Sequence, residues 1–143
     1  MFPKFVTSDT FWKYMIVNRS RYIDQLVRSK GNGLIKIITG LRRSGKSFLL
    51  KKLFRQHLLD EGVSEDHIII IDIESRKNKD FKNPDYLLDW VETEMKDDVM
   101  YYIIIDEVQE VNDFVEVLST LAVTEGTDVY VTGSNSRFLS SDV

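Results

Sequence analysis

The chain has 143 residues, enough for one domain with a sizeable core, and its 43% hydrophobic and 29% charged residues are typical of a globular protein. A net charge of −4 excludes a uniformly basic coat for nucleic acid, and the lack of cysteine excludes disulfides, cysteine-ligated metal centres and a cysteine nucleophile within this chain. No apolar run is long enough for a membrane span and no secretory signal opens the sequence, so we expect no membrane partner and a cytoplasmic location.

Charge is distributed unevenly along the sequence. Residues 1–60 carry 13 Lys and Arg and three Asp and Glu, whereas residues 61–143 carry six and 20. One interpretation is a basic face that contacts nucleotide or nucleic acid. We favour the alternative, in which the two halves interleave in one fold and neutralise each other, because charged residues mostly lie on solvated faces.

Residues 1–31 precede the predicted strands, and we expect them to form a helical segment packed on a core made of residues 32–143. Asn18 or Ser20 is suited to cap a helix within this segment. An apolar face of that helix is predicted from the spacing of Tyr22, Ile23, Leu26 and Val27.

A phosphate-binding loop is predicted next, because the sequence matches G-x-x-x-x-G-K-[ST]. The loop consists of Gly40, Leu41, Arg42, Arg43, Ser44, Gly45, Lys46 and Ser47. The glycines let backbone N–H groups turn toward phosphate oxygens, Lys46 can reach the β- and γ-phosphates, and the Ser47 hydroxyl can bind Mg²⁺. We predict that these residues and Phe48 bind the nucleotide. The alternative is an ordinary glycine turn beside a surface lysine.

A buried strand at 34–39 and a helix from Ser47 to about Asp60 flank the loop, which is the context that this motif requires. The helix is predicted to bury one face and to expose the other. The predicted buried residues are Leu50, Leu53, Phe54, His57 and Leu58, and the predicted outward residues are Lys51, Lys52 and Arg55.

A second strand is predicted at 67–73, where β-branched residues run without interruption as in a strand buried on both faces. Glu74 follows it, on the side of a parallel sheet where ligands bind, and is a candidate to polarise a water molecule or to contact an arginine of a partner. The alternative is a solvated strand end. Asn83 is predicted to cap the next helix, which begins at Pro84.

The third strand, 101–105, ends in Asp106 and Glu107. An apolar strand followed by two carboxylates is the second signature of nucleoside triphosphatases, the Walker B motif. Asp106 is predicted to hold Mg²⁺ together with Ser47, mainly through bound water, and Glu107 to polarise the attacking water.

A further helix, with Asn112 as its predicted cap, leads to a fourth strand at 128–132 and the polar turn 133–136. Ser134 or Asn135 is predicted to hydrogen-bond the γ-phosphate or the attacking water. The alternative is a turn rich in Gly, Ser and Asn with no such role.

Alternating strands and helices with right-handed crossovers predict an α/β fold of three layers, with a parallel sheet between helices. Nucleoside triphosphatases with a glutamate after the Walker B aspartate have the strand order 2-3-4-1. That order leaves the strand at 34–39 at an edge although its isoleucines are typical of the interior. We therefore predict that a fifth strand is missing, and that the chain is the N-terminal part of a longer protein.

Three stretches together resemble one family, the prokaryotic AAA-type P-loop ATPases that usually carry a C-terminal domain of unknown function. The stretches are 38–47, 104–109 and 131–136, and the similarity runs from about residue 19 to the end. The resemblance implies an ASCE-class P-loop core that binds ATP and Mg²⁺. It assigns Gly40, Gly45, Lys46 and Ser47 to Walker A, Asp106 and Glu107 to Walker B, and Ser134 or Asn135 to sensor 1. The lid, later arginines and C-terminal domain of the family have no counterpart in this chain.

Mg²⁺-dependent ATP hydrolysis coupled to a conformational change is the predicted function, with Glu107 and Lys46 as catalytic residues assisted by Ser134 and Asn135. The alternative is a nucleotide-responsive switch that acts on DNA or a protein partner with little hydrolysis. A small-molecule kinase is disfavoured, because Glu107 beside Asp106 suits activation of water. Predicted partners are ATP and ADP, together with self-association or a missing C-terminal domain; nothing beyond the basic first 60 residues supports DNA.

Overall fold

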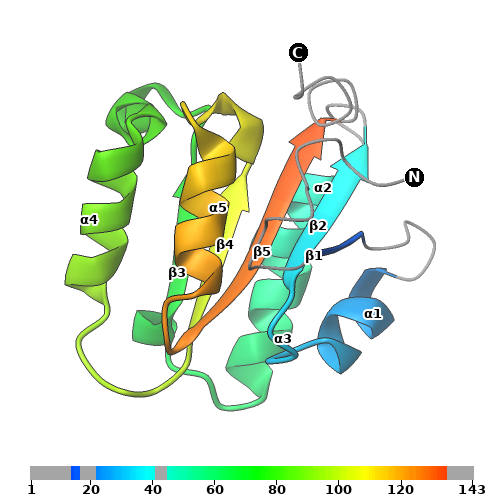
Figure 1. The fold of residues 1–143 in the computed structure, drawn as a ribbon. Helices are drawn as coiled ribbons and strands as arrows, with labels where there is room; N and C mark the ends of the chain where they lie inside the picture. Colours follow the sequence, from blue (N-terminus) through cyan, green and yellow to red (C-terminus); the bar gives the residue numbers. More distant parts are fainter. Residues whose placement is uncertain (1–13, 17–21, 41–44, 135–143) are drawn as a thin grey trace.

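A five-stranded parallel sheet with the order β1-β2-β5-β4-β3 forms the centre of the computed structural model, which describes residues 14–16, 22–40 and 45–134 (Figure 1). The strands are β1 (Tyr14–Ile16), β2 (Ile35–Gly40), β3 (Ile68–Asp72), β4 (Tyr101–Asp106) and β5 (Thr127–Ser134). All four neighbouring pairs run parallel. Because β2, β3, β4 and β5 are the four predicted strands in chain order, the α/β class and the predicted order 2-3-4-1 are confirmed.

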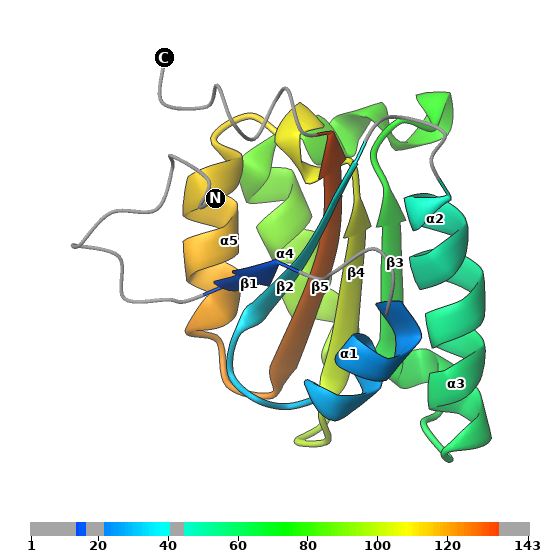
Figure 2. The same cartoon turned by 90° about the vertical axis from the view of Figure 1, so that its right-hand side faces the viewer.

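Helices cover both faces of the sheet and so complete the three layers (Figure 2). The helices are α1 (Tyr22–Arg28), α2 (Lys46–Phe48), α3 (Arg55–Asp60), α4 (Pro84–Glu94) and α5 (Phe114–Ala122), and π-helical residues Leu49–Phe54 join α2 to α3. Short 3₁₀ turns lie at Glu65–His67, Arg76–Lys82 and Val108–Glu110. Helices α4 and α5 pack on one face of the sheet, and α1, α2 and α3 pack on the other.

The strands alternate their side chains between two separate hydrophobic clusters. Ile37 of β2 and Ile103 of β4 belong to the cluster under α4 and α5. Ile38, Ile104 and Tyr130 belong to the cluster under α1, α2 and α3. Burial on both faces explains why β2 and β4 read as continuous apolar runs. Strand β3 lies at the edge of the sheet and alternates between buried and partly buried residues, so the prediction that this strand is buried on both faces is only partly correct.

The N-terminal segment differs in part from its prediction. Residues Tyr22–Arg28 are helical as expected, but Tyr14–Ile16 form strand β1, which pairs with β2 from Ile35 to Ile37. The prediction of helix is therefore wrong for residues 14–16, and so is the prediction that this edge of β2 has no neighbour within the chain. The physical reason is that buried backbone N–H and C=O groups of β2 need partners, and an apolar stretch earlier in the chain supplies them. The predicted caps Asn18 and Ser20 lie outside the described residues.

The helix after the phosphate-binding loop turns a different face to the core than its periodicity predicts. Leu50, Phe54 and Leu58 are buried, but Leu53 is 46% exposed. The intervening residues are π-helical, and a π-helix has a wider turn than an α-helix. The buried residues consequently recur at steps of four, and Leu53, predicted to be buried, turns toward solvent.

Of the two predicted caps that lie within the described residues, Asn83 and Asn112, one is confirmed. The Asn83 side chain accepts a hydrogen bond of 3.1 Å from the backbone N–H of Tyr86 and caps α4. Helix α5 begins after Asp113, so the prediction of Asn112 as its cap is wrong. Asn112 instead donates its backbone N–H to the carbonyl of Lys82 at 2.9 Å, which ties the start of α5 to the turn before α4.

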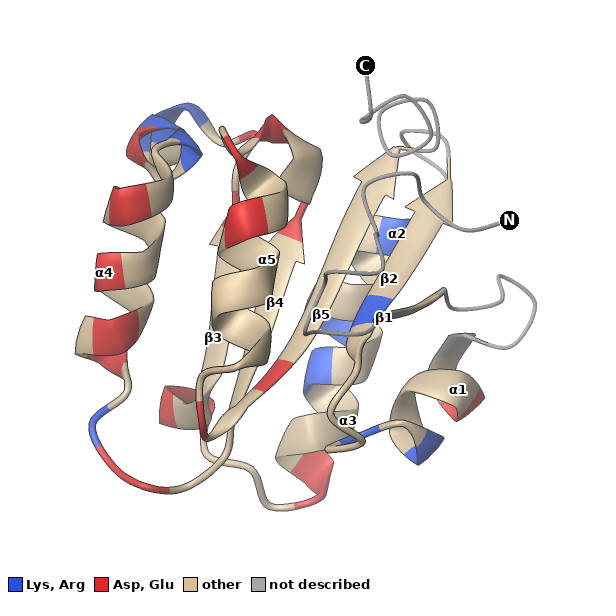
Figure 3. Cartoon of the chain, viewed as in Figure 1, with Lys and Arg blue, Asp and Glu red and all other residues tan. Residues whose placement is uncertain are grey.

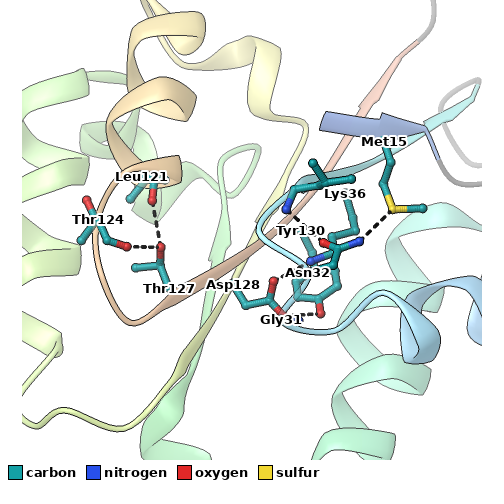
Figure 4. Close-up of polar contacts among 10 residues, drawn as sticks. Met15, Gly31, Asn32, Lys36, Leu121, Thr124, Thr127, Asp128 and Tyr130 are labelled. Carbon is teal, nitrogen blue, oxygen red and sulfur yellow. Dashed lines mark hydrogen bonds and ion pairs between the residues drawn. The ribbon is translucent and has the colours of Figure 1, made fainter. Parts of the chain in front are cut away.

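A buried polar cluster joins the opposite end of the sheet to the loop after α1 (Figure 4). The Lys36 Nζ lies 2.6 Å from the Asp128 Oδ1, and their side chains are 0% and 2% exposed. The other oxygen of Asp128 accepts the Tyr130 hydroxyl at 2.6 Å and the Gly31 N–H at 2.8 Å. Burial lowers the pKa of Lys36, although the neighbouring Asp128 opposes that effect. Burial also raises the pKa of Tyr130, which keeps its hydroxyl protonated as a donor.

Charges from the two halves of the sequence meet in ion pairs. Each of five basic residues from the first 60 positions contacts an acid from the remainder, and the pairs are Lys30–Glu61, Lys36–Asp128, Lys46–Glu107, Lys51 with Asp72 and Asp106, and Arg55–Glu65. Acidic residues are also spread along α4, away from the lysines next to α2 (Figure 3). These pairs support the interpretation in which the halves neutralise each other.

Among the described residues, no helix has both the length and the apolar character that a membrane span requires.

Candidate functional site

The predicted motifs meet where the carboxyl ends of neighbouring strands lie side by side. Gly40, at the end of β2, is paired with Ser134 at the end of β5. Asp106, at the end of β4, is paired with Asp72 at the end of β3. Parallel pairing therefore places residues from four separate segments at one edge of the sheet, where ligands bind in open α/β folds.

The described part of the predicted phosphate-binding loop consists of its two ends. Gly45 adopts φ 91°, a left-handed conformation that favours glycine, and the helical residues follow directly. Lys46, next in the chain, is buried, and its Nζ lies 2.8 Å from the Glu107 Oε2. The structure thus brings the lysine of the first motif into direct contact with the second carboxylate of the Walker B motif. Leu41, Arg42, Arg43 and Ser44 lie outside the described residues.

Ser47 and Asp106 form the second contact between the two motifs. The Ser47 hydroxyl donates to the Asp106 Oδ1 at 2.7 Å, and the Thr132 hydroxyl donates to the same oxygen at 2.5 Å. Hydroxyl and carboxylate oxygens are the hard ligands that Mg²⁺ prefers, and Mg²⁺ is usually held by one or two protein groups together with substrate phosphates and water. Ser47 and Asp106 fit that ion. Within the described part of the chain, no group of three or more His, Cys, Asp and Glu residues is arranged to hold a metal.

Glu107 is held on every side by hydrogen bonds. Its Oε1 accepts the Gln109 side-chain amide at 2.6 Å and the Ser134 hydroxyl at 3.1 Å, and its backbone N–H donates to the Thr132 hydroxyl at 2.8 Å. Burial by itself raises the pKa of Glu107, but the hydrogen bonds and charge of Lys46 and the Gln109 amide outweigh it and hold that pKa below its usual value. The carboxylate is consequently ionised at neutral pH, the form in which it can accept a proton.

Lys51 also belongs to this site, although its predicted place was the outer face of the helix. Its Nζ lies 3.2 Å from the Asp72 Oδ2 and 3.2 Å from the Asp106 Oδ2. Burial lowers the pKa of Lys51, but the charges of the two aspartates outweigh it and raise that pKa. The prediction of an outward Lys51 is wrong because two carboxylates at adjacent strand ends attract the ammonium group across the helix surface. Asp72 is the acid of β3 that reaches the site, whereas Glu74 is exposed.

The remaining candidates have different outcomes. Ser134 lies in the site through its contact with Glu107. Phe48 is 58% exposed on α2, and its contact with nucleotide stays a prediction. Asn135 lies outside the described residues.

Four residues of the site were not predicted from the sequence to belong to it: Asp72, Lys51, Gln109 and Thr132. Gln109 and Thr132 lie within the stretches that carry the family resemblance, and this placement is the signal by which they can be found. Asp72 and Lys51 carry no comparable signal, because only the packing of the helix on the strand ends brings them together.

Comparison with known protein families shows to which family the chain belongs. A family model described as an AAA domain matches residues 32–143. The chain belongs to the AAA family. Its sheet order is that of a P-loop core, and the resemblance to AAA-type P-loop ATPases drawn from the three sequence stretches is confirmed.

One relative of this AAA domain is an uncharacterized protein of Haemophilus influenzae, which is 32% identical over 129 residues. The match covers 90% of this chain and 32% of the relative, so the chain spans about a third of the length of that protein. No solved structure matches the chain significantly.

Proposed function

We propose that this AAA domain binds ATP with Mg²⁺ and hydrolyses it. The observation that carries the proposal is the double contact between the two motifs, in which Lys46 meets Glu107 at 2.8 Å and Ser47 meets Asp106 at 2.7 Å. A lysine suited to phosphate, a hydroxyl and a carboxylate suited to Mg²⁺, and a second carboxylate suited to act as a base thus lie within one largely buried cluster. These are the groups that phosphoryl transfer to water requires.

Each group has a separate task in the proposed reaction. Mg²⁺, held by Ser47 and Asp106, would neutralise charge on the phosphates when bound. Lys46 would bind the β- and γ-phosphates, and Glu107 would take a proton from the attacking water. The water oxygen forms a bond to the γ-phosphorus while the bond from that phosphorus to the β-phosphate oxygen breaks, so that ADP and phosphate leave. Residues 41–44 and Phe48 would supply further contacts to the nucleotide.

The ion pair between Lys46 and Glu107 gives the site a resting arrangement. Lys46 must turn from the Glu107 Oε2 to the phosphates when substrate binds, and this exchange leaves the Oε2 available for the proton of the water. Because the exchange replaces one negatively charged partner of Lys46 by another, the lysine stays paired throughout. Substrate binding and exposure of the base would therefore be one event.

Two substitutions test the proposal. Lys46→Ala should abolish ATP binding, measured by the anisotropy of a fluorescent ATP analogue. Glu107→Gln should retain binding and lower the hydrolysis rate by about 10²- to 10⁴-fold, the usual contribution of a general base. Lys52→Ala serves as the matched control, because Lys52 is an exposed lysine on the same helical segment. Equal hydrolysis rates in wild type and Glu107→Gln would refute the role of Glu107 as base.

The process coupled to hydrolysis is the remaining part of the proposal. We infer that the nucleotide cycle drives a conformational change passed to another copy or to a further domain, since the relative from Haemophilus influenzae is about three times as long. Five basic residues of the first 60 positions already pair with acids of the same chain, which weighs against DNA as the partner. ATP binding without turnover in the wild type would instead support the nucleotide-responsive switch.

A further inference from the structure

Gln109 lies beside the proposed base in a short 3₁₀ turn, Val108–Glu110, that directly follows Glu107. Its side chain is nearly buried, with 8% of the residue exposed. The side-chain amide Nε2 donates to the Glu107 Oε1 at 2.6 Å. The position of this side chain is set locally, because Glu107 has φ 57° and this left-handed turn bends the chain back toward the carboxylate.

The two oxygens of Glu107 have partners of different kinds. Oε1 accepts hydrogen bonds from two neutral groups, the Gln109 amide and the Ser134 hydroxyl. Oε2 is paired with the ammonium group of Lys46. Phosphate attracts an ammonium group more strongly than a neutral donor, so substrate binding changes the surroundings of Oε2 first and leaves the Gln109 amide on Oε1.

Burying the side-chain amide of Gln109 costs free energy. This cost suggests that the hydrogen bond from its Nε2 to Glu107 has a function. The Gln109 Oε1 is a buried acceptor that has no hydrogen-bond partner among the residues that the structure describes. A buried polar atom without a partner carries its full desolvation cost, and such an atom in a native fold calls for an explanation. An apolar side chain of similar shape would fill the same space without that cost.

We propose that Gln109 is a positioning residue that holds the Oε1 of Glu107, so that the Oε2 faces the attacking water once Lys46 has moved to the phosphates. This inference rests on the proposed ATP hydrolysis. Gln109 acts through Glu107 and touches no reacting atom. It therefore contributes to the rate of the chemical step and not to the binding of nucleotide.

The test replaces Gln109 by Met, which has a similar shape and no donor, and by Asn, which is shorter and cannot reach the carboxylate. Loss of a hydrogen bond to a charged group should lower kcat by about 10- to 100-fold in both variants, while the Kd for ATP and ADP stays within about twofold of wild type. In a Glu107→Gln background, Gln109→Met should lower kcat no further, since two residues that act as a unit are not additive.

A second measurement reads the contact without turnover. In protein labelled with ¹³C, the carboxyl resonance of Glu107 in the nucleotide-free chain should shift in Gln109→Met and in Ser134→Ala, and should stay in place in Glu110→Gln, a control from the same turn. An unshifted resonance in Gln109→Met would overturn the proposal, because it would show that the amide does not hold the carboxylate.

The remaining outcomes separate this proposal from the one on which it rests. If wild type hydrolyses ATP and Glu107→Gln does not, a wild-type kcat in both Gln109 variants overturns the role of Gln109 alone. If wild type binds ATP without hydrolysing it, both proposals fail. A parallel fall of ATP affinity and melting temperature in both variants would show a purely structural role for Gln109 and would also overturn the inference.

Discussion

The buried pair of Lys36 and Asp128 offers the sharpest test of how this fold is stabilised. The perturbation is Lys36→Met, which keeps the apolar stem of the side chain and removes its charge. The Asp128 carboxylate then stays buried with two neutral donors, the Tyr130 hydroxyl and the Gly31 N–H. We expect a large loss of stability, because a buried charge without its partner is far costlier than the intact pair.

The magnitude follows from the burial of the two groups. With 0% and 2% of their side chains exposed and 2.6 Å between the charged atoms, solvent screens the pair very little. Breaking such a pair by removing one partner costs about 3–5 kcal/mol. The whole free energy of unfolding of a domain is about 5–15 kcal/mol, so Lys36→Met should remove about a fifth of it or more.

Urea unfolding followed by far-UV circular dichroism measures the effect. With a slope of about 1–3 kcal/mol per molar urea, the midpoint should fall by about 1–5 M. Asp128→Asn in the Lys36→Met background tests the cause, because it removes the orphaned charge and keeps an acceptor for Tyr130 and Gly31. The double variant should lose less free energy of unfolding than the two single variants added together, by about 0.5–3 kcal/mol.

Two results would refute this reasoning. A midpoint in Lys36→Met within error of wild type would mean that the carboxylate reaches water or a new partner at no cost. Additive losses in the double variant would mean that the two side chains stabilise the fold independently, in spite of their short distance.

Three further predictions concern other parts of the chain. Asn83→Ala removes the cap of α4 and should lower the free energy of unfolding by about 1 kcal/mol in urea titrations; an unchanged midpoint would contradict the cap. Gly45→Ala places a side chain at φ 91°, at a strain of about 1–2 kcal/mol, so ATP affinity measured by anisotropy should fall at least severalfold, and wild-type affinity would disprove the need for glycine. Lys51→Met leaves the carboxylates of Asp72 and Asp106 without the ammonium that they share and should cost about 1 kcal/mol of stability, which Asp72→Asn should restore; no recovery would argue against repulsion as the cause.

Features of the fold that depend on neighbours in sequence were predictable. The cap at Asn83 follows from a local residue pattern. The strand order of β2 to β5 follows from the order that nucleoside triphosphatases with a Walker B glutamate share, together with the general rules of parallel sheets. The pairing of Gly40 with Ser134 and the meeting of Ser47 with Asp106 follow from the same rules, because parallel strands that end at one edge bring their following residues together. The family match over residues 32–143 agrees with them.

Features that depend on partners far along the chain were missed. Residues 14–16 have no strand signal of their own and become a strand because β2 offers an open edge. Lys51 looks like a surface residue until the packing of its helix places it between two aspartates. A π-helical turn rotates Leu53 out of the core, a change that regular α-helical periodicity does not anticipate.

By itself the sequence determined which residues are candidates for the proposed chemistry, because a glycine-rich loop and an Asp-Glu pair after a buried strand are local patterns with few other uses. Only the tertiary structure decided how those residues are paired: Lys46 on one oxygen of Glu107, Gln109 and Ser134 on the other, and Lys51 across two strand ends. The physical reason is that hydrogen bonds and ion pairs act over a few ångströms. Packing therefore decides which groups form these bonds, and the separation of two residues along the chain says little about whether packing brings them together.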